Sequence, residues 1–166
     1  MDADLAALSL AIGAAALAAT EPVLIATAES CTGGWAAQVI THTAGSSAWF
    51  ERGFVAYANT AKMDMLGVPE ATLTTHGAVS EATAQALSQG ALVHSKATHS
   101  LAITGIAGPT GGTIDKPVGT VCFAWSSRSE PTQAETKHFT GNRESIRRQA
   151  VVHALTILLA RLTPIT

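Results

Sequence analysis

The chain has few charged residues and few cysteines, and each shortage excludes a class of protein. Charged residues make up 13% of its 166 residues, and the formal net charge is −2 with no cluster of Lys or Arg. Nucleic-acid binding through phosphates requires a basic surface, so we do not expect that function. Cys31 and Cys122 are too few for a disulfide framework and are typical of reduced thiols in a cytoplasmic protein.

The sequence also has no segment typical of secretion or of membrane insertion. An apolar, Ala-rich run of 15 residues ends at Ala19, but no Lys or Arg precedes Arg52. A secretory signal begins with a basic region, and a run of this length is too short to cross a bilayer. Because its leucines and isoleucine follow a helical spacing, we predict a packed first helix and no contact with a membrane.

What the chain does contain is an alternation of helix and strand signals. Apolar, β-branched runs indicate strands, and periodic apolar residues with capping side chains indicate helices. The predicted order is a helix at 4–19, a strand at 23–28, a helix at 32–42, a strand at 50–58, a short helix capped by Asn59 and ending at Gly67, a helix at 81–95 capped by Ser80, strands at 100–104, 118–126 and 132–139, and a last helix capped by Asn142. The last two strands are predicted to be antiparallel. This order predicts an α/β fold, a three-layer α/β/α sandwich with a mixed sheet in a single domain over residues 1–166.

The most informative segment is Thr27-Ala28-Glu29-Ser30-Cys31-Thr32-Gly33-Gly34, in which an apolar strand ends at a carboxylate, a serine and two glycines. Ligands of α/β sheets gather at the carboxyl ends of strands, and glycines let a substrate approach the backbone closely. Small hydroxyls and free N–H groups at a helix N-terminus suit an anion, including one that forms during acyl transfer. Ser30 is therefore a candidate nucleophile, and the competing interpretation is a simple helix cap.

A nucleophilic serine needs a base, and Lys62 is the better candidate because none of the six histidines stands in a motif beside an acid. Lys62 falls in the first turn of the short helix, where the helix dipole opposes its charge and lowers its pKa. Partial burial beside Tyr57 would act in the same direction. The alternative is an ordinary lysine on a solvated surface.

Two further features suit a phosphate group. The segment from Gly105 to Gly112 holds four glycines after a second buried strand, and Thr104 at the strand exit could donate its hydroxyl there. This loop lacks the ending of a P-loop, so a purely structural turn is the alternative. Arg143 and Arg147 open the last helix, where a cation is unfavourable unless an anion is present, although a solvated helix face would also account for them. No spacing typical of a metal site occurs.

Taken together, these segments resemble the C-terminal domain of the competence/damage-inducible CinA family, also known as nicotinamide-nucleotide amidohydrolases. The matching segments are 27–34, 45–47, 55–62, 66–69, 76–80, 104–109, 116–121 and 141–143. They cover nearly the whole chain in the order and spacing of the family. Longer members carry an additional N-terminal domain, which we expect this chain to lack.

The resemblance implies hydrolysis of the carboxamide of nicotinamide mononucleotide (NMN) to nicotinate mononucleotide and ammonia, in pyridine nucleotide salvage and without a metal or organic cofactor. It implies that Ser30 is the nucleophile and Lys62 the base, with Tyr57 and Thr104 in the same catalytic pocket. Backbone N–H groups near Thr32 to Gly34 are expected to stabilise the oxyanion. The implied substrate-binding residues are Cys31, Thr32, Gly33, Gly34, Asn59, Gly105, Gly108 and Arg143.

Two other functions fit the same residues. One is a nucleotide-binding module that does not cleave its ligand, and the other is a Ser-Lys amidase with a different substrate. Release of ammonia from NMN distinguishes the binding module from the amidohydrolase, and a loss of activity in Arg143→Ala chiefly through substrate affinity would argue against the amidase with a different substrate. A homodimer is plausible, because pockets of this kind often form near subunit contacts.

Overall fold

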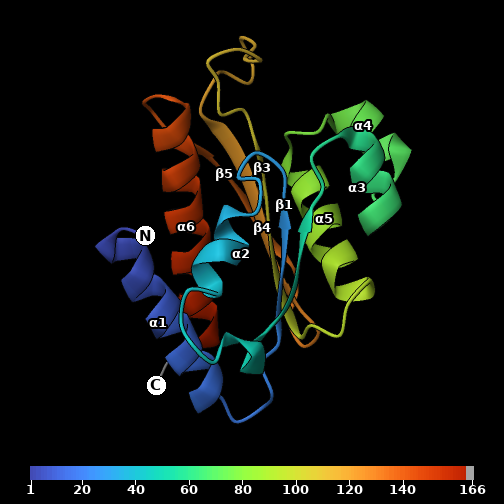
Figure 1. Ribbon diagram of the computed structural model, residues 1–166. Helices are drawn as coiled ribbons and strands as arrows, with labels where there is room; N and C mark the ends of the chain where they lie inside the picture. Colours follow the sequence, from blue (N-terminus) through green and yellow to red (C-terminus); the bar gives the residue numbers. More distant parts are fainter. Residues whose placement is uncertain (164–166) are drawn as a thin grey trace.

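The computed structural model describes residues 1–163, and its middle layer is a five-stranded sheet (Figure 1). The strands are β1 (Ile25–Glu29), β2 (Phe50–Val55), β3 (His99–Gly105), β4 (Thr120–Ser127) and β5 (Gln133–His138). Their order across the sheet is β2-β1-β3-β4-β5. β1 is parallel to both of its neighbours, whereas β4 is antiparallel to β3 and to β5. The predicted mixed sheet with a final antiparallel pair is therefore confirmed.

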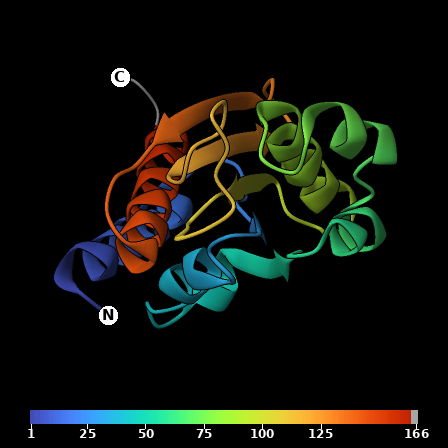
Figure 2. The same ribbon diagram turned by 90° about the horizontal axis from the view of Figure 1, so that it is seen from above.

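Helices cover both faces of this sheet. They are α1 (Ala3–Ala18), α2 (Trp35–Ile40), α3 (Asn59–Leu66), α4 (Glu70–His76), α5 (Glu81–Val93) and α6 (Arg143–Leu162), with a 3-10 turn, η1, at Ser46–Ala48. α1, α2 and α6 lie on one face, and α3, α4 and α5 lie on the other (Figures 1 and 2). This is the predicted single-domain α/β/α sandwich. No helix within residues 1–163 is long and apolar enough to cross a membrane.

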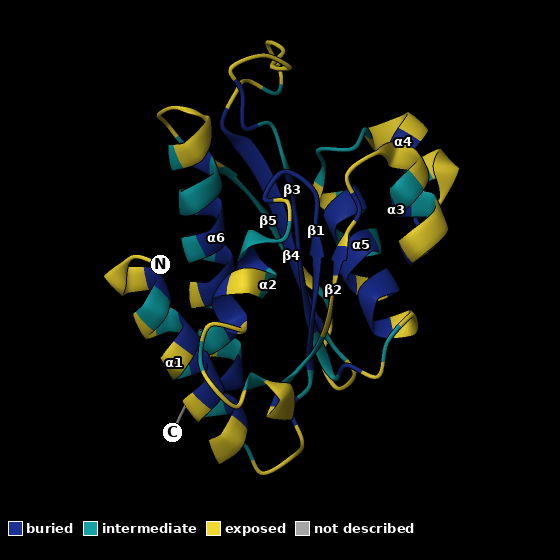
Figure 3. Cartoon of the chain, viewed as in Figure 1, coloured by how far each residue is buried: buried dark blue, intermediate teal, exposed yellow. Residues whose placement is uncertain are grey.

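The central strands are buried on both sides because each face has its own apolar core. Every residue of β1 is buried, and its side chains alternate between the cores (Figure 3). Ile25 packs into the core under α1, α2 and α6, whereas Ala26 and Ala28 pack into the core under α3, α4 and α5. Ala26 and Ala28 are small, so α5 packs closely against this side of the sheet.

Capping side chains begin two of the helices as predicted. Ser80 Oγ accepts a hydrogen bond from the Thr83 N–H at the start of α5, and Asn142 Oδ1 accepts one from the Ser145 N–H at the start of α6. Asn59 was predicted to cap the short helix, and this is wrong. Ala58 is the N-cap residue of α3 and Asn59 is its first helical residue, so the Asn59 side chain is not used for capping.

The structure also differs from the predicted helices in two places. α2 begins at Trp35 instead of residue 32, because Gly33 and Gly34 have positive φ angles of 60° and 94° and interrupt a right-handed helix. α4, which follows Pro69, was not predicted. It is only seven residues long and carries five threonine, histidine or glutamate side chains, so its sequence has little apolar periodicity.

Candidate active site

Ser30 lies directly after β1, in a tight turn at the carboxyl end of the sheet. Its N–H donates to the carbonyl of Ile103 in β3 at 2.9 Å, and the Gly33 N–H donates to the Ser30 carbonyl at 3.1 Å. The N-cap residue of α2 is Gly34, four residues later. The helix-cap interpretation of Ser30 is therefore wrong, and its hydroxyl is available for other contacts.

Glu29 provides the missing helix cap. Its buried carboxylate accepts hydrogen bonds from the N–H groups of Gly34 at 3.2 Å, Ala36 at 3.0 Å and Ala37 at 2.9 Å, and from the Thr32 hydroxyl at 2.6 Å. A carboxylate at this position satisfies the free donors of the first helical turn and interacts favourably with the helix dipole. The sequence shows this carboxylate at the strand end, but no pattern in it predicts the capping role.

The Lys62 side chain reaches Ser30 from α3. Its amine Nζ donates to Ser30 Oγ at 3.2 Å and to the Tyr57 carbonyl at 2.7 Å. Only 1% of Lys62 is exposed to solvent, so the interpretation as a solvated surface lysine is wrong. Two side chains 32 positions apart in the sequence thus meet within hydrogen-bonding distance.

The surroundings of Lys62 favour the neutral amine. Burial lowers the pKa of Lys62, and this effect exceeds the opposing influence of the nearby Cys31. None of the ion pairs formed within residues 1–163 includes Lys62. A buried amine without a carboxylate partner gives up its proton more readily than an ordinary lysine and can act as a general base.

Ser30 and Lys62 share a cavity of about 220 Å³. All four of the predicted catalytic residues and four of the predicted binding residues line it, together with three small or apolar residues that were not predicted. The lining residues are Ser30, Cys31, Tyr57, Asn59, Lys62, Thr104, Gly105 and Arg143, and the additional ones are Ala78, Val79 and Ala107. The added residues come from the segment before α5 and from the loop after β3; both lie in segments that match the family, but small and apolar side chains gave no reason to assign them a role.

Thr104 lines the cavity, but its hydroxyl has another partner. Its Oγ1 donates to the carbonyl of Ala78 at 2.7 Å, so the prediction that it donates into the cavity is wrong. This bond ties the end of β3 to the segment that precedes α5. Thr104 thereby shapes the cavity wall.

Cys31 is a second potentially reactive group beside Ser30. Burial raises the pKa of its thiol to about 12, and a protonated thiol is a poor nucleophile. Within residues 1–163, no group of three or more His, Cys, Asp or Glu side chains is arranged to hold a metal ion. The Ser30 hydroxyl and the Lys62 amine are the pair with the geometry for nucleophilic attack.

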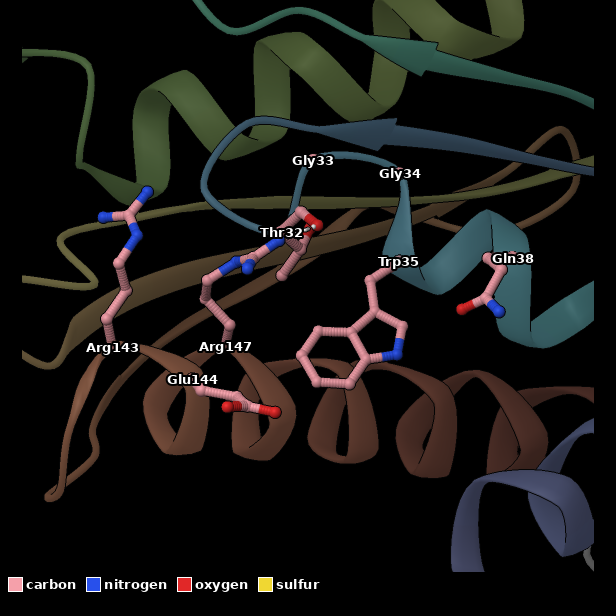
Figure 4. A pocket seen from close by; sticks show the side chains of 8 residues that line it. All are labelled: Thr32, Gly33, Gly34, Trp35, Gln38, Arg143, Glu144 and Arg147. Atoms are coloured by element: carbon pink, nitrogen blue, oxygen red, sulfur yellow. Dashed lines mark hydrogen bonds between the residues drawn. The ribbon is translucent and has the colours of Figure 1, made fainter. Parts of the chain in front are cut away.

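A larger cavity of about 620 Å³ adjoins the first one (Figure 4). It is lined by Thr32, Gly33, Gly34, Trp35, Gln38, Arg143, Glu144 and Arg147. Three predicted binding residues, Thr32, Gly33 and Gly34, therefore line this cavity and not the one that holds Ser30. Arg143 borders both.

The Arg143 side chain is exposed but held in place. Its Nη1 donates to the Gly108 carbonyl at 2.8 Å, and its Nη2 donates to the Tyr57 hydroxyl at 3.3 Å. Gly108 therefore contributes by holding Arg143. A cation fixed where the two cavities meet suits an anionic part of a ligand, which a freely solvated arginine would not favour to the same degree.

The predicted oxyanion donors need a correction. The Gly33 N–H donates to the Ser30 carbonyl and the Gly34 N–H to Glu29, so neither is free. The N–H groups of Cys31 and Thr32 have no acceptor in the described part of the chain. Any oxyanion site in this turn is therefore formed by these two groups.

Comparisons with known proteins all point to the same family. The model of the CinA C-terminal domain matches residues 8–162. A protein of Escherichia coli (strain K12) named nicotinamide-nucleotide amidohydrolase PncC is 50% identical over 157 residues, which are 95% of this chain and 94% of that protein. A protein of Pseudomonas putida with the same name is 49% identical over 81% of this chain and 84% of its own length.

Solved structures agree with this relationship. The competence/damage-inducible protein CihA of Agrobacterium tumefaciens has a TM-score of 0.90 and 43% identity, covering 96% of each chain. A CinA superfamily protein of Klebsiella pneumoniae 700603 has a TM-score of 0.89 and 37% identity over 95% of this chain and 97% of its own. With a family model that spans nearly all of its residues and relatives at about half identity, this chain belongs to the CinA C-terminal domain family.

Proposed function

We propose that this protein hydrolyses the carboxamide of NMN to nicotinate mononucleotide and ammonia, with Ser30 as the nucleophile and Lys62 as the general base. The observation that carries the proposal is the buried Lys62 amine, which lies 3.2 Å from Ser30 Oγ without a carboxylate partner. The names of the relatives supply the substrate, because those from E. coli and P. putida are named nicotinamide-nucleotide amidohydrolases.

In the first step, the neutral Lys62 amine takes the proton of the Ser30 hydroxyl, and Ser30 Oγ attacks the amide carbon. The carbonyl oxygen becomes an oxyanion, and we propose that the N–H groups of Cys31 and Thr32, which have no acceptor in the described residues, donate to it. Donors fixed before the reaction cost no reorganisation when the charge forms. The Tyr57 carbonyl, 2.7 Å from Lys62 Nζ, orients the amine toward the serine.

In the second step, the tetrahedral intermediate collapses and the C–N bond breaks. Lys62 returns its proton to the departing nitrogen, ammonia leaves, and an ester joins the nicotinoyl carbon to Ser30 Oγ. Lys62 then takes a proton from water, whose oxygen attacks the ester carbon. The C–Oγ bond breaks, Ser30 regains a proton, and nicotinate mononucleotide is released.

The sizes of the two cavities suggest which part of the substrate binds in each of them. Pockets for ligands of moderate size typically have volumes of about 300–1,000 Å³, and the Ser30 cavity of about 220 Å³ is smaller. It suits the carboxamide and its ring, whereas the ribose and phosphate extend past Arg143 toward the larger cavity. Arg143 is then the phosphate contact.

The test is ammonia release from the purified protein incubated with NMN, with the corresponding riboside and with the dinucleotide. Ser30→Ala should remove turnover while the fold and NMN binding persist, because only the hydroxyl is lost. Normal turnover in Ser30→Ala would refute the covalent mechanism. NMN binding without ammonia release from the unmodified protein would identify a binding module instead.

A variant of Arg143 distinguishes this proposal from a Ser-Lys amidase that acts on another substrate. Arg143→Ala should raise KM for NMN more than it lowers kcat, since the phosphate is remote from the bond that breaks. An amidase that does not recognise a phosphate would be unaffected. We also propose a cytoplasmic location, supported by the two cysteines, which are both free thiols.

A further inference from the structure

Arg147 reaches from α6 to the turn that contains Ser30. Its Nε donates to the Cys31 carbonyl at 3.0 Å, and its Nη2 donates to the Thr32 carbonyl at 3.0 Å. The Trp35 ring packs against the guanidinium, whose central carbon lies 5.5 Å from the ring centroid. Figure 4 shows Arg147 beside Thr32 and Trp35, between α6 and the turn. Both partners of this arginine are backbone groups that follow the candidate nucleophile.

Holding a carbonyl also fixes the direction of the next N–H. A trans peptide is planar, and its C=O and N–H bonds point in opposite directions. When Arg147 holds the Cys31 carbonyl, the Thr32 N–H must therefore point away from the guanidinium. When it holds the Thr32 carbonyl, the Gly33 N–H is likewise turned away, and it donates to the Ser30 carbonyl at 3.1 Å.

Glu29 holds other groups of the same turn. The Glu29 carboxylate accepts from the Thr32 hydroxyl and from the Gly34 N–H, so it orients the groups that Arg147 does not contact. After both sets of bonds are made, the N–H groups of Cys31 and Thr32 remain without an acceptor in the described residues. A positive charge on the carbonyl side of a peptide also makes its N–H a stronger donor.

We propose that Arg147 is a positioning residue for the reaction. It holds the Cys31–Thr32 peptide so that the N–H groups of Thr32 and Cys31 donate hydrogen bonds to the oxyanion. The residue after the nucleophile supplies such a donor in other serine hydrolases as well. The identity of the substrate in this inference rests on the proposed function, whereas the contacts of Arg147 do not depend on it. Arg147 acts through the backbone of the turn and not by contact with the reacting atoms.

A direct contact between Arg147 and the substrate phosphate is the competing role, because Arg147 lines the larger cavity. The two roles affect different kinetic constants. Loss of a transition-state donor lowers kcat, whereas loss of a phosphate contact raises KM. Arg143, proposed as the phosphate contact, supplies the comparison within the same protein.

The first measurement is the rate of NMN hydrolysis by Arg147→Met, Arg147→Lys and the control Arg148→Met. Arg148 is the next residue of α6 and pairs with Asp2 and Asp4, away from both cavities. We expect Arg147→Met to lose about 10- to 100-fold in kcat with KM changed by less than about threefold. Arg147→Lys should recover part of kcat, since one ammonium can hold one carbonyl, and Arg148→Met should behave as the unmodified protein. Unchanged kcat, or a change in KM alone, overturns the inference. Thermal unfolding of each variant separates these effects from loss of fold.

The second measurement uses a probe without a nucleotide, diisopropyl fluorophosphate. Ser30 Oγ forms a bond to phosphorus, the P–F bond breaks, fluoride leaves, and Lys62 takes the hydroxyl proton. The phosphoryl oxygen requires the same donors, so labelling of Arg147→Met should be about tenfold slower or more.

Slower labelling in a protein that does not hydrolyse NMN would reject the proposed substrate and keep the role of Arg147. NMN hydrolysis and labelling that are both unaffected by Arg147→Met would reject the inference alone. A protein that neither hydrolyses NMN nor reacts with the probe would reject both.

Discussion

Two glycine-containing segments follow neighbouring parallel strands at the same edge of the sheet, and they differ in how they are held. The turn after β1, Ser30–Gly34, is fixed by the Glu29 carboxylate, by Arg147 and by the end of β3. The loop after β3 lines the Ser30 cavity only at its start, and its outer part extends beyond the end of the sheet (Figure 1). Ile114, in this outer part, is fully exposed. Glycine content is similar in the two segments, so glycine alone does not identify a site. The first turn differs in that two charged side chains, Glu29 and Arg147, each bond to more than one of its backbone groups, whereas the loop after β3 receives a single such bond, from Arg143 to the Gly108 carbonyl.

The largest expected effect comes from the base that faces the first turn. Lys62→Met keeps the length and apolar stem of the side chain but removes the amine, and we expect kcat to fall by about 10²- to 10⁴-fold. The unfolding free energy should not decrease, because the buried amine is replaced by an apolar group. Lys96→Met, at an exposed lysine, is the matched control. Ammonia release and thermal unfolding measure both effects, and near-normal turnover in Lys62→Met would show that another group is the base.

The second prediction concerns pH. Burial lowers the pKa of Lys62 from its ordinary value of 10.5, so the folded state binds fewer protons than the unfolded state between the two pKa values. Stability therefore increases with pH across this window, and the contribution is lost as pH falls through the lowered pKa. For catalysis, kcat/KM should increase about tenfold per pH unit on the acidic side and level off above the pKa of Lys62. A profile that levels off only near 10.5 would contradict the neutral-amine mechanism.

A smaller effect is expected where Glu29 holds the turn. Glu29→Gln replaces one acceptor oxygen by a donor that faces backbone N–H groups, and it should lower the unfolding free energy by about 2–4 kcal/mol. Turnover should fall as well, because the same bonds position Thr32. Glu130→Gln is the control, since the Glu130 side chain, which pairs with Arg161, is mostly exposed and the pair contributes less than about 1 kcal/mol. Equal denaturation midpoints for the two variants would show that the turn does not depend on Glu29.

The smallest effect is expected in the second segment. Ile114→Ser removes a side chain that is fully exposed, so the unfolding free energy should change by less than about 0.5 kcal/mol. Turnover with NMN should stay within about twofold of the unmodified protein. A large loss of activity would mean that the outer part of this loop reaches the substrate, and the contrast between the two segments would then disappear.

Local sequence patterns were sufficient for the layers of the fold, but they only made Ser30 and Lys62 candidates with alternatives open, and it was the resemblance to the CinA family that implied their pairing. Strand and helix periodicity predicted the mixed sheet, and the turn after β1 and the lysine in a helical first turn are each contained in a short segment. The additional contacts of the site are not local. Arg147 and the Cys31 carbonyl are 116 positions apart, and only the packing of α6 against the sheet brings them together.

Two errors also have a physical origin. The helix after Ser30 was predicted to begin at residue 32, because hydroxyl and glycine residues are typical of helix N-termini. The positive φ angles of Gly33 and Gly34 prevent a helix from beginning there, and the Glu29 side chain caps α2 from the preceding strand, so the first helical residue is Trp35. The oxyanion donors were misplaced for the same reason, since Glu29 and the Ser30 carbonyl occupy the N–H groups of Gly34 and Gly33.

The candidate nucleophile and base are supported by opposite layers of the sandwich. Cys31, beside the serine, packs into the core under α1, α2 and α6, whereas Leu66 of the helix that carries Lys62 packs into the core under α3, α4 and α5. The reactive pair is therefore assembled only when both cores have formed. During refolding, turnover should return at the rate of the slower core, so that catalysis reports complete assembly of the molecule where helical content alone would not.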